Sequence, residues 1–160
     1  YLFTGYVRRS LYHGFDWDEF KLALMVSAPA VVLHELGHKF VGILFGLSAV
    51  FEVFWGGLVI GLLLKVMNSP FLLIAPGYVV IHGSGSNLSH LLISLAGPML
   101  NLILFLAAYL ILERKKRLSR KQTVFLHLTK QINLFLFIFN MIPIPPLDGF
   151  SVFRNLIGLF

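Results

Sequence analysis

Long apolar runs separated by short polar breaks make up most of this chain. Runs over residues 20–47, 50–67, 88–112 and 123–142 approach or exceed the length of about 20 apolar residues that crosses a bilayer. Residues 150–160 begin a further helical run. The pattern predicts an all-α polytopic membrane protein with about four to five membrane segments. It leaves open whether residues 50–67 cross completely, and therefore how the first segment is oriented.

Two stretches depart from the helical pattern. Residues 78–81 are aromatic and β-branched and follow Pro76-Gly77, which predicts a short strand or extended loop. Extended backbone at membrane depth requires cover from protein or a water-filled cavity, so we expect a small membrane-embedded element. Farther along, three prolines within residues 143–146 cannot continue a helix. They predict an unwound segment that presents Asp148 to a polar partner.

The ends of the chain differ from its middle. Residues 1–19 mix aromatic and charged side chains, which predicts an amphipathic segment at the membrane interface. These charges, without a cleavable apolar region, argue against a signal peptide. Residues 20–155 form the expected core. Residues 156–160 are interpreted as the start of a further segment, so we expect the chain to be a piece of a longer protein.

Composition supports a membrane protein and narrows its chemistry. The 160 residues are 58% hydrophobic and 12% charged, about half the charged content of a soluble domain. Without cysteine, neither disulfides nor thiolate ligands are available. The net charge of +6 lies largely in the loop at residues 113–121. Because this loop separates two apolar runs, we expect it to be cytoplasmic under the positive-inside rule, and we expect no nucleic-acid partner.

The sequence His34-Glu35-Leu36-Gly37-His38 lies within the first apolar run. This HExxH pattern places two imidazoles one helical turn apart on one face, where both can bind one zinc ion beside Glu35 as a general base. The alternative is a set of polar residues satisfied at a helix–helix contact. Each charged residue at the centre of a membrane helix costs roughly 2.5–3.5 kcal/mol, which favours a functional reason for the cluster.

Two histidines leave a catalytic zinc site incomplete, since three protein ligands are expected. Asp148 is the favoured third ligand because it follows the proline-rich break within an apolar stretch. Its alternative interpretation is an N-cap of the helix that follows. Glu52, at a helix junction, is a weaker candidate. We expect His82 to lie near the entry to the site, and His90 to lie at a segment end without a metal role.

Three separated stretches together resemble the site-2 protease family of intramembrane zinc metalloproteases, in particular its archaeal and bacterial branch. They are residues 34–38, the sequence Ser94-Leu95-Ala96-Gly97-Pro98, and residues 140–149 with their Leu-Asp-Gly ending. Their order matches the family, and the resemblance covers about residues 30–155. The proline pair before Leu147 and the strongly basic loop depart from the better-known branches.

The resemblance implies a site and a reaction. One catalytic zinc ion would bind to His34, His38 and Asp148, with Glu35 activating water and Asn140 stabilising the oxyanion. Residues 78–81 would correspond to a membrane-embedded strand that receives unwound substrate.

The function that follows is hydrolysis of peptide bonds in membrane-spanning protein substrates, that is, regulated intramembrane proteolysis in the cell membrane. A divalent-metal transporter and a catalytically inactive membrane metal-binding protein are the alternatives. The sequence leaves the natural substrate and the oligomeric state open.

Overall fold

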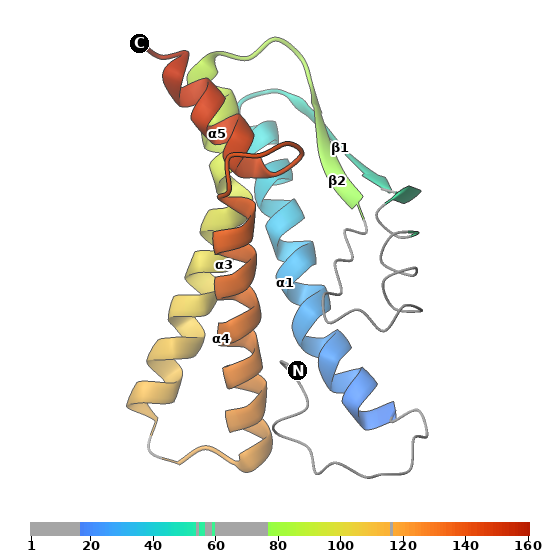
Figure 1. Ribbon diagram of the computed structural model, residues 1–160, viewed down its shortest axis with the longest axis vertical. Coiled ribbons are helices and arrows are strands. Elements are labelled where there is room, and N and C mark those ends of the chain that lie inside the picture. The colour runs from blue at the N-terminus through green and yellow to red at the C-terminus, as the bar shows by residue number, and fades with distance from the viewer. Residues whose placement is uncertain (1–16, 54, 57–58, 60–76, 116) are drawn as a thin grey trace.

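The computed structural model describes residues 17–53, 55–56, 59, 77–115 and 117–160 (Figure 1). Three long helices match three of the expected apolar runs, and a shorter helix follows the proline-rich break. In chain order, the elements are α1 (Trp17–Leu44), β1 (Ser48–Val53), β2 (Gly77–His82), α3 (Asn87–Arg114), α4 (Arg120–Asn140) and α5 (Asp148–Ile157).

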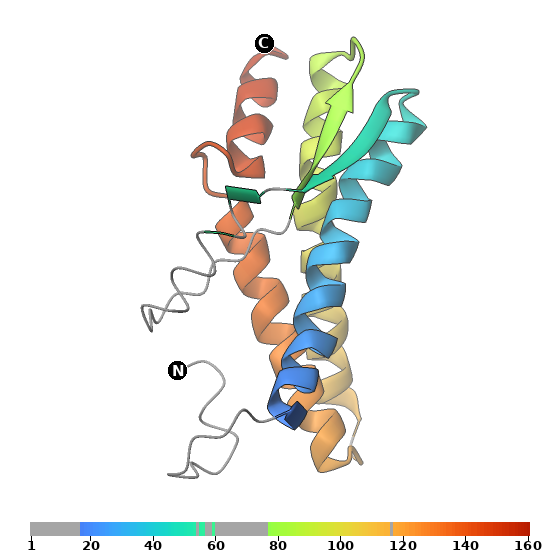
Figure 2. The ribbon, with the colours of Figure 1, turned by 90° about the vertical axis from the view of Figure 1, so that its right-hand side faces the viewer.

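The helix α3 is the centre of the arrangement. It contacts α1, α4 and α5. In Figures 1 and 2, α1 and α4 run in one direction, α3 runs in the opposite direction, and α5 resumes the direction of α4 after the break. The 28 residues of α3 extend about 40 Å, so its two halves lie beside α5 and α4 in turn. The break between α4 and α5 therefore faces the middle of the long helices.

Beside α1 lies a two-stranded antiparallel sheet. β1 and β2 pair from Ser48 opposite His82 to Val53 opposite Gly77. The strand expected at residues 78–81 is confirmed. The apolar run 50–67, however, begins in strand β1 and not in a helix. Residues 60–67 lie outside the described residues.

Glycine makes the connection between α1 and β1 possible. Gly46 has φ 71°, in the left-handed region that glycine adopts without strain. The Leu47 N–H donates to the carbonyl of Gly42 across this turn at 3.0 Å. An added Cβ at Gly46 would meet nothing within 4 Å, so this glycine serves the turn and not a close packing contact.

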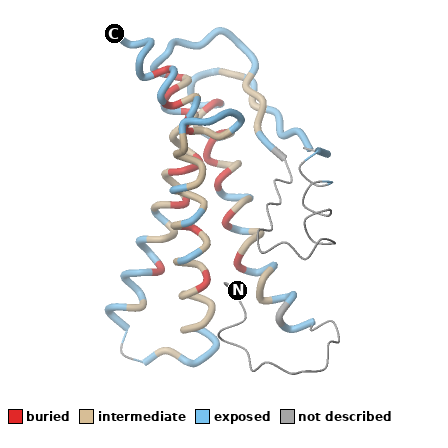
Figure 3. Tube along the Cα trace, viewed as in Figure 1, coloured by how far each residue is buried: buried red, intermediate tan, exposed pale blue. Residues whose placement is uncertain are grey.

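Two described helices are long and apolar enough to cross a membrane, namely α1 over Phe20–Leu44 and α3 over Asn87–Arg114. Only 22% and 33% of their most apolar windows are buried, so most of these side chains face outward, unlike those of a soluble core helix. Figure 3 shows the buried positions on the facing sides of the helices. The expected total of four to five membrane segments stays a prediction.

The ends of the elements differ slightly from the expected boundaries. Helix α1 begins at Trp17, so residues 17–19 belong to it and not to a separate interfacial segment, and residues 1–16 lie outside the described residues. The basic stretch is shorter as a loop than expected, because α3 continues to Arg114 and α4 begins at Arg120. Ser119 caps α4 in a capping box with Gln122.

Candidate metal centre

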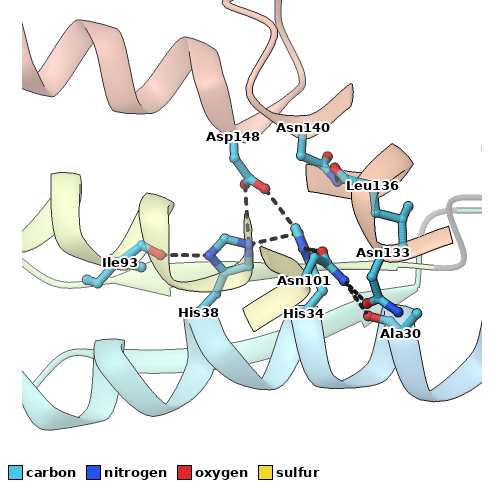
Figure 4. A network of polar contacts seen from close by, with 9 residues as sticks. All are labelled: Ala30, His34, His38, Ile93, Asn101, Asn133, Leu136, Asn140 and Asp148. Carbon is cyan, nitrogen blue, oxygen red and sulfur yellow. Dashed lines mark hydrogen bonds and ion pairs between the residues drawn. The ribbon is translucent and has the colours of Figure 1, made fainter. Parts of the chain in front are cut away.

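His34, His38 and Asp148 meet between α1 and the start of α5 (Figure 4). The Asp148 carboxylate lies 3.0 Å from Nε2 of His34 and 3.3 Å from Nε2 of His38. The two Nε2 atoms are 3.2 Å apart. In the described part of the chain, this is the group of His, Asp and Glu side chains that could hold a metal ion.

The donor set fits a single zinc ion. Tetrahedral zinc with bonds of about 2.1 Å places its ligand atoms about 3.4 Å apart, close to the 3.0–3.3 Å separations seen here. Both histidines are buried, with 6% and 7% of their surface exposed. Two imidazole nitrogens and a carboxylate converging on one buried point are the hard and borderline ligands that zinc accepts.

The second nitrogen of each imidazole is tied to helix α3. Nδ1 of His38 lies 2.7 Å from the backbone carbonyl of Ile93, and Nδ1 of His34 lies 2.6 Å from Oδ1 of Asn101. Such outer partners fix the orientation of a metal-binding histidine. They also leave both Nε2 atoms directed towards Asp148.

Space for the two imidazoles depends on Gly97. A Cβ at this position would clash with Nε2 of His38 and would lie 2.8 Å from Nε2 of His34. Gly37 directly precedes His38 on α1, and a Cβ there would lie 2.9 Å from the carbonyl oxygen of Ala96. Helices α1 and α3 therefore approach each other closely at Gly37, and the small residues of the Ser94–Pro98 stretch make the site possible.

The proline-rich break delivers Asp148. Helix α4 ends at Asn140 and α5 begins at Asp148. Leu147 occupies the N-cap position without a side-chain cap, so the capping interpretation of Asp148 is wrong. Gly149 packs against the backbone of the break, where a Cβ would clash with the carbonyl of Met141. The chain thus turns tightly enough to direct the carboxylate towards the histidines.

A cavity of about 680 Å³ opens onto the three candidate ligands. Glu35 and Asn140 both line this cavity. Tyr78, Val79 and Ile81 of β2 line the same cavity. The amide of Asn140 donates to the carbonyl of Leu136 at 3.0 Å. The strand β2 therefore runs along the cavity.

Four other polar residues can be placed relative to the cavity. His90 lies in the first turn of α3, at the segment end where it was expected, and it also lines the cavity, as does Arg154. His82 is exposed and does not line this cavity. Glu52 lies on the exposed strand β1, where the Tyr78 hydroxyl donates to it at 3.4 Å, away from the candidate ligands. Long-range packing, which the sequence pattern does not encode, decides all these placements.

The chain is similar in sequence to known proteins. Residues 115–159 match peptidase family M50. The chain is 33% identical over 145 residues to "Putative zinc metalloprotease MJ0611" of Methanocaldococcus jannaschii, across 89% of this chain and 74% of that protein. It is 36% identical over 78 residues to "Putative zinc metalloprotease YwhC" of Bacillus subtilis, across 44% of this chain and 36% of that protein.

A third relative is "Putative zinc metalloprotease sll0528" of Synechocystis. It is 29% identical over 146 residues, which cover 90% of this chain and 33% of that protein. This chain therefore spans about a third of the length of the second and third relatives.

Proposed function

The chain belongs to peptidase family M50, the site-2 protease family, and we propose that it is an intramembrane zinc endopeptidase that cleaves membrane-spanning protein substrates. The observation that carries this proposal is the convergence of His34, His38 and Asp148 on one buried point, beside a cavity that Glu35 also lines. The family and the two long apolar helices support a membrane location. The multi-pass topology and the cytoplasmic side of loop 113–121 belong to the proposal.

The chemistry divides between the ion and the protein. One zinc ion held by His34, His38 and Asp148 would supply Lewis acidity that acidifies water and polarises a peptide carbonyl. Glu35 lies between the two histidines in sequence and borders the cavity. It takes the proton of the attacking water and later gives a proton to the leaving amine.

Asn140 is suited to hold the developing negative charge. One hydrogen of its amide is used by the Leu136 carbonyl, which leaves the second N–H available for an oxyanion. Its position at the last residue of α4, on the cavity wall, brings this donor near the candidate ligands.

The strand β2 is suited to bind an extended substrate. Tyr78, Val79 and Ile81 line the cavity, and the strand pairs with β1 on one side. A helical substrate segment conceals its carbonyls within its own hydrogen bonds, so it must unwind before cleavage. Pairing with a strand edge would satisfy the backbone groups released by unwinding.

Cleavage of a single-span model substrate by the purified chain in detergent tests the proposal. Wild-type protein should cut, and a zinc chelator should abolish cutting. Glu35→Gln should keep zinc but lose at least about 100-fold in turnover, since general acid–base catalysis contributes 10²–10⁴. Glu113→Gln is the matched control and should keep its turnover, because this exposed carboxylate near the end of α3 belongs neither to the candidate ligands nor to the cavity lining.

The other outcomes point to other functions. Full activity in Glu35→Gln would contradict its assignment as the base. Stoichiometric zinc without cleavage by any variant would favour a metal-binding or metal-transporting membrane protein.

A further inference from the structure

A buried chain of amide hydrogen bonds leads from α4 through α3 to His34 (Figure 4). The Asn101 side chain is fully buried, with 0% exposure. Its Oδ1 lies 2.6 Å from Nδ1 of His34. Its Nδ2 donates to the carbonyl of Ala30 at 3.1 Å and to Oδ1 of Asn133 at 2.9 Å. Asn133 in turn donates from Nδ2 to the carbonyl of Thr129 at 2.8 Å.

The partners fix the direction of every bond in this chain. A backbone carbonyl can only accept, so Asn133 must present its amino group to Thr129 and its oxygen to Asn101. Asn101 faces two acceptors, the Ala30 carbonyl and Oδ1 of Asn133, so its amino group must lie on that side. Its oxygen is thereby directed at His34, and Nδ1 of His34 has to be the donor.

We propose that Asn101 is a positioning residue that fixes His34 in the tautomer with the proton on Nδ1, and that Asn133 holds Asn101 in the orientation this requires. Nε2 of His34 then carries the lone pair that a metal needs. The contact between the two asparagines joins α3 to α4, and it also sets the protonation pattern of a candidate ligand. The inference rests on the proposed zinc site.

His38 provides an internal comparison. Its Nδ1 faces the backbone carbonyl of Ile93 at 2.7 Å, so its tautomer is set by the position of α3 alone. No side chain needs to be oriented for this bond. Replacement of Asn101 should therefore alter the tautomer of His34 and leave that of His38 unchanged.

The first test replaces Asn101 by leucine, which has a similar size but no hydrogen-bonding group. In metal-free protein, ¹⁵N NMR of the imidazoles should show a proton on Nδ1 of His34 in the wild type, whereas in Asn101→Leu the Nδ1 proton should be lost in favour of Nε2, which faces the Asp148 carboxylate at 3.0 Å. The signals of His38 should keep the wild-type pattern. Zinc affinity, measured by competition with a chromophoric chelator, should fall 10–100-fold, the loss typical of an outer partner of a metal ligand.

A second variant separates positioning from helix packing. Asn101→Asp keeps an oxygen for His34 but loses the amino group that serves Ala30 and Asn133. It should lower the melting temperature, keep the proton on Nδ1 of His34, and bind zinc within a few-fold of wild type. If Asn101→Leu does not fold, Asn101→Asp alone tests the proposal. Loss of the Nδ1 proton or of zinc affinity in Asn101→Asp would then overturn the proposal.

The outcomes distinguish this inference from the proposed function. Unchanged His34 signals in Asn101→Leu would overturn the positioning role even if the protein cleaves substrate. A wild-type protein that shows the Nδ1 tautomer but binds no zinc would instead contradict the proposed function.

Discussion

The two sides of the metal centre are held in place by different means. His34 and His38 lie on an uninterrupted helix, with 8% and 9% of their side chains exposed, and both rings bond to α3. Asp148 is the first residue of a ten-residue helix after the break at residues 141–147, and its side chain is 23% exposed. The hydrogen bonds and ion pairs described for its carboxylate go only to the two histidines.

The histidines are therefore positioned before any metal binds, whereas the site is completed only when the Asp148 carboxylate reaches them. Helix periodicity and outer hydrogen bonds position the histidines whether or not Asp148 is present. The aspartate depends on how tightly the chain turns between α4 and α5. Changes on the histidine side should therefore disturb both metal binding and helix packing, while changes on the aspartate side should affect metal binding with less effect on stability.

The largest effect is expected from Gly97→Ala on the histidine side. The added Cβ would clash with Nε2 of His38 and approach Nε2 of His34, so both rings must move. Stoichiometric zinc binding should be lost, and overpacking should lower the free energy of unfolding by about 1–3 kcal/mol. Metal analysis of the purified protein and thermal unfolding measure the two effects.

Gly42→Ala is the matched control for this prediction. Gly42 is buried on the same helix, but its added Cβ would meet mainly the flexible end of Ile81, at 3.1 Å. This variant should bind zinc like the wild type. Normal zinc content in Gly97→Ala would show that the histidines do not need the space that glycine leaves.

A smaller effect, on zinc affinity and not on stability, is expected from Asp148→Asn. A neutral amide is a poorer zinc ligand than a carboxylate, so zinc affinity should fall by more than the 10–100-fold typical of an outer partner. The free energy of unfolding in chelator should change by less than about 1 kcal/mol, since the amide has nearly the same size as the carboxylate and can still hydrogen-bond the two imidazoles. A large loss of stability in chelator would contradict the comparison between the two sides.

The histidine side was the more predictable side from sequence. The spacing of residues 34–38 is local, and a helix of any tertiary context places both imidazoles on one face. The proline-rich break was also visible, because prolines interrupt a helix wherever they occur. These local signals were sufficient to name all three candidate ligands and the strand at residues 78–81.

Long-range contacts account for what the sequence missed. Asn101 is a polar residue in an apolar helix, but its bond to His34 joins residues 67 positions apart, so no local pattern predicts it. Its place one turn beyond Gly97 on α3 could have indicated a shared face, since residues four apart on a helix are neighbours. The strand β1 was missed because the apolar run 50–67 fits a buried strand as well as a helix, and only pairing with β2 decides between them.

The smallest effect is expected from Gly149→Ala on the aspartate side. A Cβ here would meet the backbone of Met141 and, at 2.6 Å, the carbonyl oxygen of Ile142, so the start of α5 must shift away from the break. Because the carboxylate of Asp148 can partly follow through its own rotation, zinc affinity should fall by about tenfold, at the lower end of the range for indirect effects. The imidazole ¹⁵N signals of the metal-free protein should keep both histidines protonated at Nδ1, since their bonds to α3 do not involve the break. Altered tautomers at His34 or His38 in Gly149→Ala would mean that the two sides of the centre are coupled through the fold, and that the histidines are not preorganised independently of the aspartate.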